Sequence, residues 1–173
     1  KRRTIVLVIT SFCFVGIIST LVLMINWKKD VNANKELQQR IEKVIGTNEQ
    51  NNNDIDFDEL RKINSDTVGY FEVPSVGIKY AVVKGKDNSY YLDHNFSKNY
   101  NAAGWIFADY RNKFDGKDKN IVMYGHSMRN GSMFGSLHKI LNDKNYEKEE
   151  NQIITFATPE GTFKYKLFSV YTA

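Results

Sequence analysis

His126 is the residue of this sequence best suited to acid–base chemistry. It follows an apolar run that ends at Tyr124 and a glycine, and a polar segment from Ser127 to Ser132 comes directly after it. An imidazole exchanges protons near neutral pH, and a titratable group at a strand end beside a glycine suits a general acid or base. From the local sequence alone, a structural histidine or one in an exposed turn is the commoner case.

The other polar candidates have simpler explanations. His94 lies in a polar stretch typical of a turn, and His138 lies beside a lysine on a segment with helical spacing, where it would face solvent. Asp109 and Arg111 follow an apolar run and are typical of a surface ion pair. The sequence has no H-E-x-x-H zinc motif, no G-x-S-x-G nucleophile elbow and no glycine-rich phosphate loop. We therefore expect no metal and no cofactor.

Thiol chemistry has one candidate, because Cys13 is the single cysteine of the 173 residues. One thiol cannot form an internal disulfide or a cysteine-rich metal site. Cys13 lies within Thr4 to Ile25, which is 22 residues without a charge. A helix of that length is about 33 Å long, enough to cross a bilayer. Within such a helix Cys13 is most simply a small apolar packing residue.

The flanks of this apolar segment indicate an uncleaved signal-anchor. Three basic residues, 1–3, precede it, and Trp27 with two lysines follows it, as interfacial anchors do. A cleaved signal peptide is the alternative, but its apolar core is about 7–15 residues long and ends at a small-x-small site. The uncharged run here is longer, and no A-x-A motif follows it. The charges favour the N-terminus inside the cell. We therefore expect a cell-membrane protein that crosses once, with its folded domain outside.

The net charge excludes one class of partner. The first 30 residues carry five basic and one acidic side chain, which accounts for the whole formal charge of +4. The remaining residues are neutral overall, so no basic domain is present to neutralise phosphates, and we expect no nucleic-acid partner.

The remaining elements position these candidates. Helical spacing covers 34–45, a polar loop 47–54, and a second helix begins at Asp56 as N-cap. From Thr67 short β-branched and aromatic runs alternate with Gly and Pro, as in an all-β barrel or sandwich. We divide the chain into 1–30, flank and transmembrane anchor; 31–65, helical stalk or brace; and 66–173, β-barrel domain. The predicted strands are 68–73, 78–84, 90–92, 104–108, 120–124, 152–157 and 162–171, with a helix at 133–141.

Three segments of this domain resemble class B sortases. The segment 124–137, YGHSMRNGSMFGSL, is similar to the family's histidine segment, which usually reads close to YGHNMRDGSMFGSL. Residues 66–70 resemble its first strand, and 104–112 its G-x-I-F-x-D-Y-R-N segment. The likeness runs from about Asp66 to Ala173. It implies a mostly β fold, a sortase-like closed β-barrel of eight strands with N-terminal helices and a transmembrane signal-anchor helix. That barrel would be incomplete here, because the family's last two strands come later.

The resemblance implies a membrane-anchored cysteine transpeptidase. Such an enzyme cleaves a C-terminal sorting motif of exported proteins, of the NPxT-(G/N) kind, through a cysteine thioester and joins them to cell-wall peptidoglycan. His126 would be the catalytic acid and base, and Asn88, Leu92 and Tyr124 would contact substrate. The implied partners are surface proteins that carry the sorting signal, the amine of a peptidoglycan cross-bridge or stem peptide on a lipid-linked precursor, and the membrane.

The sequence departs from this pattern in one respect. The family's nucleophilic cysteine and its arginine come after the point matched by Ala173, and Cys13 cannot replace the thiol from within a membrane. We therefore expect a fragment that is inactive alone and has an unclosed, association-prone sheet edge. The alternative is a non-catalytic surface binding module on a sortase-like barrel. A soluble nucleic-acid- or metabolite-binding barrel conflicts with the anchor and the neutral domain.

Overall fold

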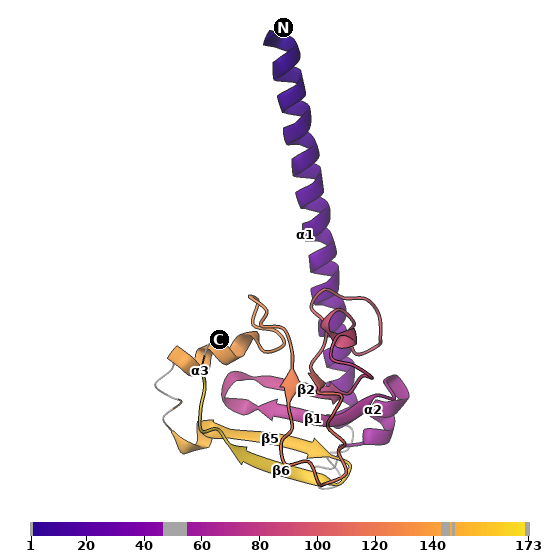
Figure 1. The fold of residues 1–173 in the computed structure, drawn as a ribbon, viewed down its shortest axis with the longest axis vertical. Helices are drawn as coiled ribbons and strands as arrows, with labels where there is room; N and C mark the ends of the chain where they lie inside the picture. Colours follow the sequence, from indigo (N-terminus) through magenta and orange to yellow (C-terminus); the bar gives the residue numbers. More distant parts are fainter. Residues whose placement is uncertain (1, 47–54, 143–145, 147, 172–173) are drawn as a thin grey trace.

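A single long helix leads into a β-sheet domain (Figure 1). The computed structural model describes residues 2–46, 55–142, 146 and 148–171, so the predicted loop 47–54 lies outside the described residues. Helix α1 runs from Arg2–Gly46 over 45 residues without a break. The apolar segment and the amphipathic segment 34–45 are therefore two parts of one helix.

The C-terminal part of α1 packs on the domain. Leu37 and Ile41 are buried there in the main core, and Asn34 is buried beside them. The Asn34 amide donates to Asn101 Oδ1 over 3.3 Å, and Asn101 Nδ2 donates to the backbone oxygen of Asp30 over 2.8 Å. Polar and apolar contacts together fix this part of the helix against the domain.

A short second helix, α2, confirms the predicted N-cap. It spans Phe57–Ile63, and the Asp56 side chain accepts a hydrogen bond from the backbone N–H of Glu59 at 2.9 Å. This bond satisfies one of the free N–H groups at the helix start. Phe57 and Leu60 on its inner face are buried in the same core as α1.

The sheet of the described residues has six strands in the order β4-β3-β2-β1-β5-β6. Neighbouring strands are antiparallel except β2 and β3, which are parallel. The sheet is open, with β4 and β6 at its edges, and it carries the mostly β fold that the sequence predicts. The strands are β1 Thr67–Val73, β2 Ile78–Val83, β3 Phe107–Ala108, β4 Met123–Tyr124, β5 Ile153–Thr158 and β6 Gly161–Lys166.

Several predicted strands are shorter or absent. Tyr90–Leu92 forms the 3-10 helix η2, so the prediction of a strand there was wrong. The segment looks apolar in the sequence because Tyr91 is buried in the core, where its hydroxyl donates a hydrogen bond to Asp66. In place of one helix at 133–141 the chain forms the 3-10 helix η3, Gly135–Leu137, followed by α3, His138–Asn142. The structure also describes the 3-10 helices η1 Pro74–Val76 and η5 Glu149–Gln152.

An apolar groove lies between the two edges of the sheet. It has a volume of about 970 Å³ and is open to solvent. Its lining comes from β1, β4, β5, β6 and the segment around η3, and its apolar side chains include Phe71, Met123, Phe134, Leu137, Ile154 and Phe156. Beyond β6, the side chains of Phe168 and Tyr171 are 98% and 81% exposed. This part of the domain therefore presents apolar surface to water.

Candidate active site

His126 lies on a tight loop directly after β4, and we call residues 126–134 the histidine loop. The loop folds back on itself, since Ser127 bridges Met133 and the Phe134 N–H donates to the His126 backbone oxygen over 3.0 Å. Gly135 allows this close return, because a Cβ there would lie 2.0 Å from the Met128 carbonyl oxygen. The glycine is needed for space at this position, and it fixes the path of the loop that carries the histidine.

The imidazole of His126 is held by a backbone carbonyl. Its Nε2 lies 2.8 Å from the backbone oxygen of Leu92 at the end of η2. A carbonyl oxygen only accepts, so Nε2 carries the hydrogen of this bond. Gly104 packs behind the same carbonyl, where a Cβ would approach the Leu92 oxygen to 2.5 Å. The neutral ring thus presents Nδ1 as its acceptor, and the ring is half-buried.

Asp109 joins two other predicted site residues. It is 2% exposed, and its Oδ2 accepts hydrogen bonds from Asn88 Nδ2 and the Tyr124 hydroxyl, both at 2.9 Å. Arg111 donates to both carboxylate oxygens over 2.8 Å. The Asn88 amide oxygen accepts from the backbone N–H of Tyr110 over 3.0 Å. The expected ion pair between Asp109 and Arg111 therefore forms, but its surface position was wrong for the aspartate, which is the buried centre of a network.

The network sets the charge of its members. Hydrogen bonds from Arg111, and then from Asn88 and Tyr124, hold the pKa of Asp109 well below its usual range despite burial. The hydrogen bond to Asp109, together with burial, raises the pKa of the Tyr124 hydroxyl. Tyr124 is thus a neutral donor to an ionised carboxylate near neutral pH. Its hydroxyl is fixed in place rather than available to accept a proton.

The structure brings the four predicted site residues into one region. The Leu92 backbone oxygen bonds His126 directly, while Asn88 and Tyr124 both bond Asp109. Tyr124 is the last residue of β4 and precedes His126 by two residues. Their catalytic and binding roles stay predictions. Asp109 was missed as a site residue, although the G-x-I-F-x-D-Y-R-N resemblance includes it.

The other two histidines have different partners. His94 stacks on Tyr90 with ring centroids 4.0 Å apart and bonds the backbone oxygen of Tyr90, as suits a turn residue. His138 on α3 is exposed, and its Nε2 lies 2.8 Å from the hydroxyl oxygen of Ser127 on the histidine loop. Within the part of the chain that the structure describes, no group of three or more His, Cys, Asp or Glu side chains could hold a metal ion.

Cys13 lies far from this region. It is exposed on α1, in the one described helix that is long and apolar enough to cross a membrane. Asp30, which bonds the domain, follows Cys13 by 17 residues, or about 25 Å along the helix. The Cys13 thiol therefore does not approach His126.

Comparisons with known proteins identify the family. The sortase domain model matches residues 71–173. Sortase B of Listeria monocytogenes is 41% identical over 115 residues, which are 65% of this chain and 45% of that protein. Sortase B of Staphylococcus aureus is 33% identical over 144 residues, covering 83% of this chain and 58% of that protein. The chain thus spans about half the length of the curated relatives it matches.

Solved structures agree with this fold. Sortase B of Bacillus anthracis in complex with AAEK1 superposes with a TM-score of 0.72 at 31% identity, over 83% of this chain and 69% of that one. A Staphylococcus aureus sortase B–substrate complex gives 0.68 at 30% identity, over 82% of this chain and 64% of that one. The open sheet with its N-terminal helix corresponds to part of the sortase barrel. From the domain match and these relatives, the chain belongs to the sortase family, within the class B sortases.

Proposed function

We propose that this chain carries the catalytic histidine of a membrane-anchored class B transpeptidase. The enzyme would cleave an NPxT-(G/N) sorting motif of exported proteins and join them to a peptidoglycan amine. The observation that supports this most is His126, which lies within the family's histidine segment and is fixed by the Leu92 carbonyl beside the Asp109 network. Catalytic groups need such fixed orientation.

The proposed proton transfers use Nδ1 of His126. A cysteine thiolate attacks the threonine carbonyl carbon, and the C–N bond breaks as the imidazolium gives its proton to the departing amine. The acceptor amine then attacks the thioester carbonyl, the C–S bond breaks, and the neutral imidazole takes the amine proton. Nε2 keeps its hydrogen bond to Leu92 throughout, so the ring does not need to turn between the two steps.

Asn88, Leu92 and Tyr124 would form the wall of the substrate groove. The Leu92 side chain is 41% exposed and is free to contact an apolar substrate group. Asn88 uses one amide hydrogen and its oxygen within the network, which leaves its second amide hydrogen for substrate. Tyr124 is held by Asp109, so its ring presents a fixed face.

We also propose that α1 anchors the domain outside the membrane. The helix has a suitable length and composition, and its first residues are basic. The nucleophilic thiol would come from a part of the whole protein other than these 173 residues, since Cys13 lies within α1. The relatives are about twice as long as the matched segment, which leaves room for such a part.

The test uses the whole protein encoded by the complete reading frame, with an internally quenched NPxTN peptide and an added amine acceptor. We expect His126→Gln to lower cleavage and transfer by at least roughly 10²-fold, the usual contribution of a general acid–base. Lys43→Ala, an exposed change on α1, is the control and should retain activity. A reading frame with no further cysteine would overturn the transpeptidase proposal. A whole protein that binds the peptide without cleaving it would support the binding-module alternative.

A further inference from the structure

The connection between the apolar part of α1 and the domain is rigid. No loop separates them, because α1 is one helix from Arg2–Gly46. Asp30 lies five residues beyond Ile25, about 7.5 Å along the helix axis. At this point the domain is already bound, since the Asp30 carboxylate accepts from the Ala102 N–H over 3.0 Å and its backbone oxygen accepts from Asn101. The domain therefore begins immediately outside the apolar segment.

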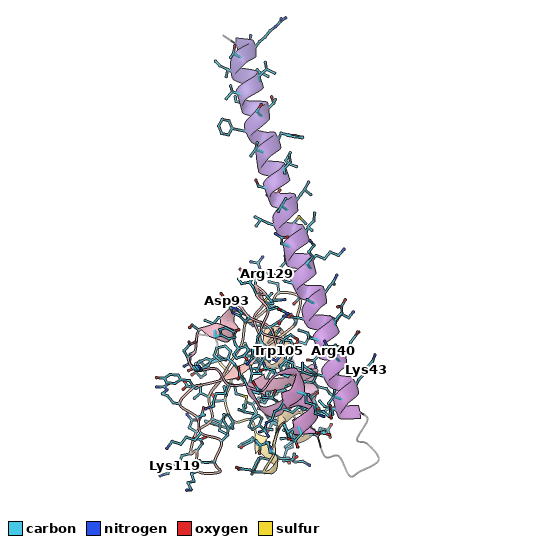
Figure 2. The ribbon with its side chains drawn as sticks, turned by 90° about the vertical axis from the view of Figure 1, so that its right-hand side faces the viewer. Arg40, Lys43, Asp93, Trp105, Lys119 and Arg129 are labelled. Carbon is cyan, nitrogen blue, oxygen red and sulfur yellow. The ribbon has the colours of Figure 1, made fainter. Side chains whose placement is uncertain are left out.

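Two loops form the side of the domain that faces the apolar part of α1. Loop 93–104 bonds α1 at Asp30 and Asn34, and residues of loop 127–132 line a cleft along the same stretch of the helix. Figure 2 shows Asp93 and Arg129 at the end of the domain toward which the free helix projects, and Lys119 at the opposite end. We call loops 93–104 and 127–132 the helix-side loops.

The exposed side chains of these loops suit a lipid headgroup layer. Tyr100 is 71% exposed, next to the residues that bond Asp30. Tyrosine is enriched at membrane interfaces, where its ring and hydroxyl meet apolar and polar surroundings at once. Arg129 is exposed on the other loop and can pair with lipid phosphate. The headgroup region is about 5–7 Å deep on each side of the bilayer, which is comparable to the axial distance from Ile25 to Asp30.

We propose that the helix-side loops rest on the membrane surface, with Tyr100 and Arg129 in the headgroup layer. The rigid α1 sets this orientation, and the His126 site then opens beside the bilayer. The placement of the site follows from its geometry, since His126 bonds the Leu92 carbonyl and Leu92 directly precedes the helix-side loop 93–104. Substrates would thus react at the membrane surface. This inference rests on the proposed membrane anchoring of α1.

The experiment uses the whole protein encoded by the complete reading frame, with any cysteine outside these 173 residues changed to Ser, in phosphatidylcholine–phosphatidylglycerol nanodiscs. A fluorescent label is placed at single cysteines. Native Cys13 reports the span itself. Tyr100→Cys and Lys119→Cys, each combined with Cys13→Ala, report the two ends of the domain. Lipids with a nitroxide on the headgroup or deep in the acyl chain serve as quenchers. We expect acyl-chain quenching at position 13, headgroup quenching at position 100, and no quenching at position 119.

The outcomes separate the inference from the anchoring on which it rests. Quenching at position 13 together with equal signals at positions 100 and 119 would overturn the proposed orientation and leave the anchor intact. An unquenched label at position 13 would overturn the anchor and the orientation with it. Adding Asp30→Ala and Asn34→Ala to the Tyr100→Cys variant removes the hydrogen bonds that these two side chains make to loop 93–104 and leaves the bond from Asn101 to the Asp30 backbone oxygen. Headgroup quenching should then decrease. Unchanged quenching would show that the side-chain hydrogen bonds of Asp30 and Asn34 do not set the orientation.

Discussion

Gly135→Ala should disable the histidine loop while leaving the chemistry of every site residue unchanged. The new Cβ would lie 2.0 Å from the Met128 carbonyl oxygen, whereas ordinary contacts begin near 3.4 Å. The backbone of loop 127–134 must therefore move by roughly 1 Å, and a shift of that size can lower catalysis about 10²-fold. Forced overpacking costs about 1–3 kcal/mol. The upper value corresponds to a fall in Tm of about 6–12 °C for a protein of this size.

The measurement combines thermal unfolding of the whole protein with peptide cleavage at a temperature well below both transitions. Gly131→Ala is the matched control in the same loop. It has open space around its Cβ position but a φ of +80°, so it tests backbone strain alone. We expect both variants to lose stability and only Gly135→Ala to lose most of its kcat/KM. Wild-type activity in Gly135→Ala, or equal losses in the two variants, would refute the idea that close packing at Gly135 positions His126.

Three further predictions concern the network, the helix contact and the groove. The pKa of Asp109 is lowered in the folded protein, so its carboxylate stabilises the fold fully above its unfolded pKa of about 4 and loses this effect as pH falls below that value. Urea unfolding should therefore show a stability deficit in Asp109→Asn at pH 7 that shrinks at pH 3. Ile41→Ala removes a fully buried side chain between α1 and the domain and should cost about 2–5 kcal/mol in urea unfolding. Phe168→Ser should reduce self-association of the 173-residue chain in sedimentation experiments and its binding of an apolar dye, because Phe168 is 98% exposed beside the groove.

Each of these predictions has a defined contrary result. A deficit in Asp109→Asn that is the same at both pH values would show that the ionised carboxylate does not stabilise the fold. Lys43→Ala, an exposed change on the same helix as Ile41, should be nearly neutral, and an equal loss there would argue against core packing as the cause. A wild-type chain that is monomeric and binds no dye would contradict the apolar exposure at the groove.

The sequence predicted best where local signals were strong. The Asp56 cap follows from a side-chain acceptor at the helix start, and strand β1 from a β-branched and aromatic run. The histidine loop after β4 follows from an apolar run that ends at glycine. The prediction for Tyr90–Leu92 failed because tertiary packing decided it. Tyr91 is buried in the core and its hydroxyl bonds Asp66, and the 3-10 helix allows both contacts. The apolar residues of this segment therefore reflect packing in the core and not strand pairing.

The role of Asp109 was not readable from its neighbours. The aspartate and Arg111 are two residues apart, as in many exposed ion pairs. Two of its partners, Asn88 and Tyr124, are 21 and 15 residues away. Tyr124 reaches it when β3 pairs with β4, and Asn88 follows β2, which pairs with the other side of β3. Contacts of that range have no local signature, so the centre of the network became visible only in the folded chain.

The bond between His126 Nε2 and the Leu92 backbone oxygen also affects how this site can vary by mutation. A substitution at position 92 changes the exposed side chain but leaves the carbonyl in place, because every amino acid carries that oxygen. Preference for different substrate side chains could therefore change at position 92 without loss of the group that orients the histidine. Had a carboxylate side chain held the ring, a single nucleotide change could have removed it. With the roles proposed for Leu92 and His126, substrate choice and proton transfer would be genetically separable, although the side chain and the carbonyl belong to the same residue.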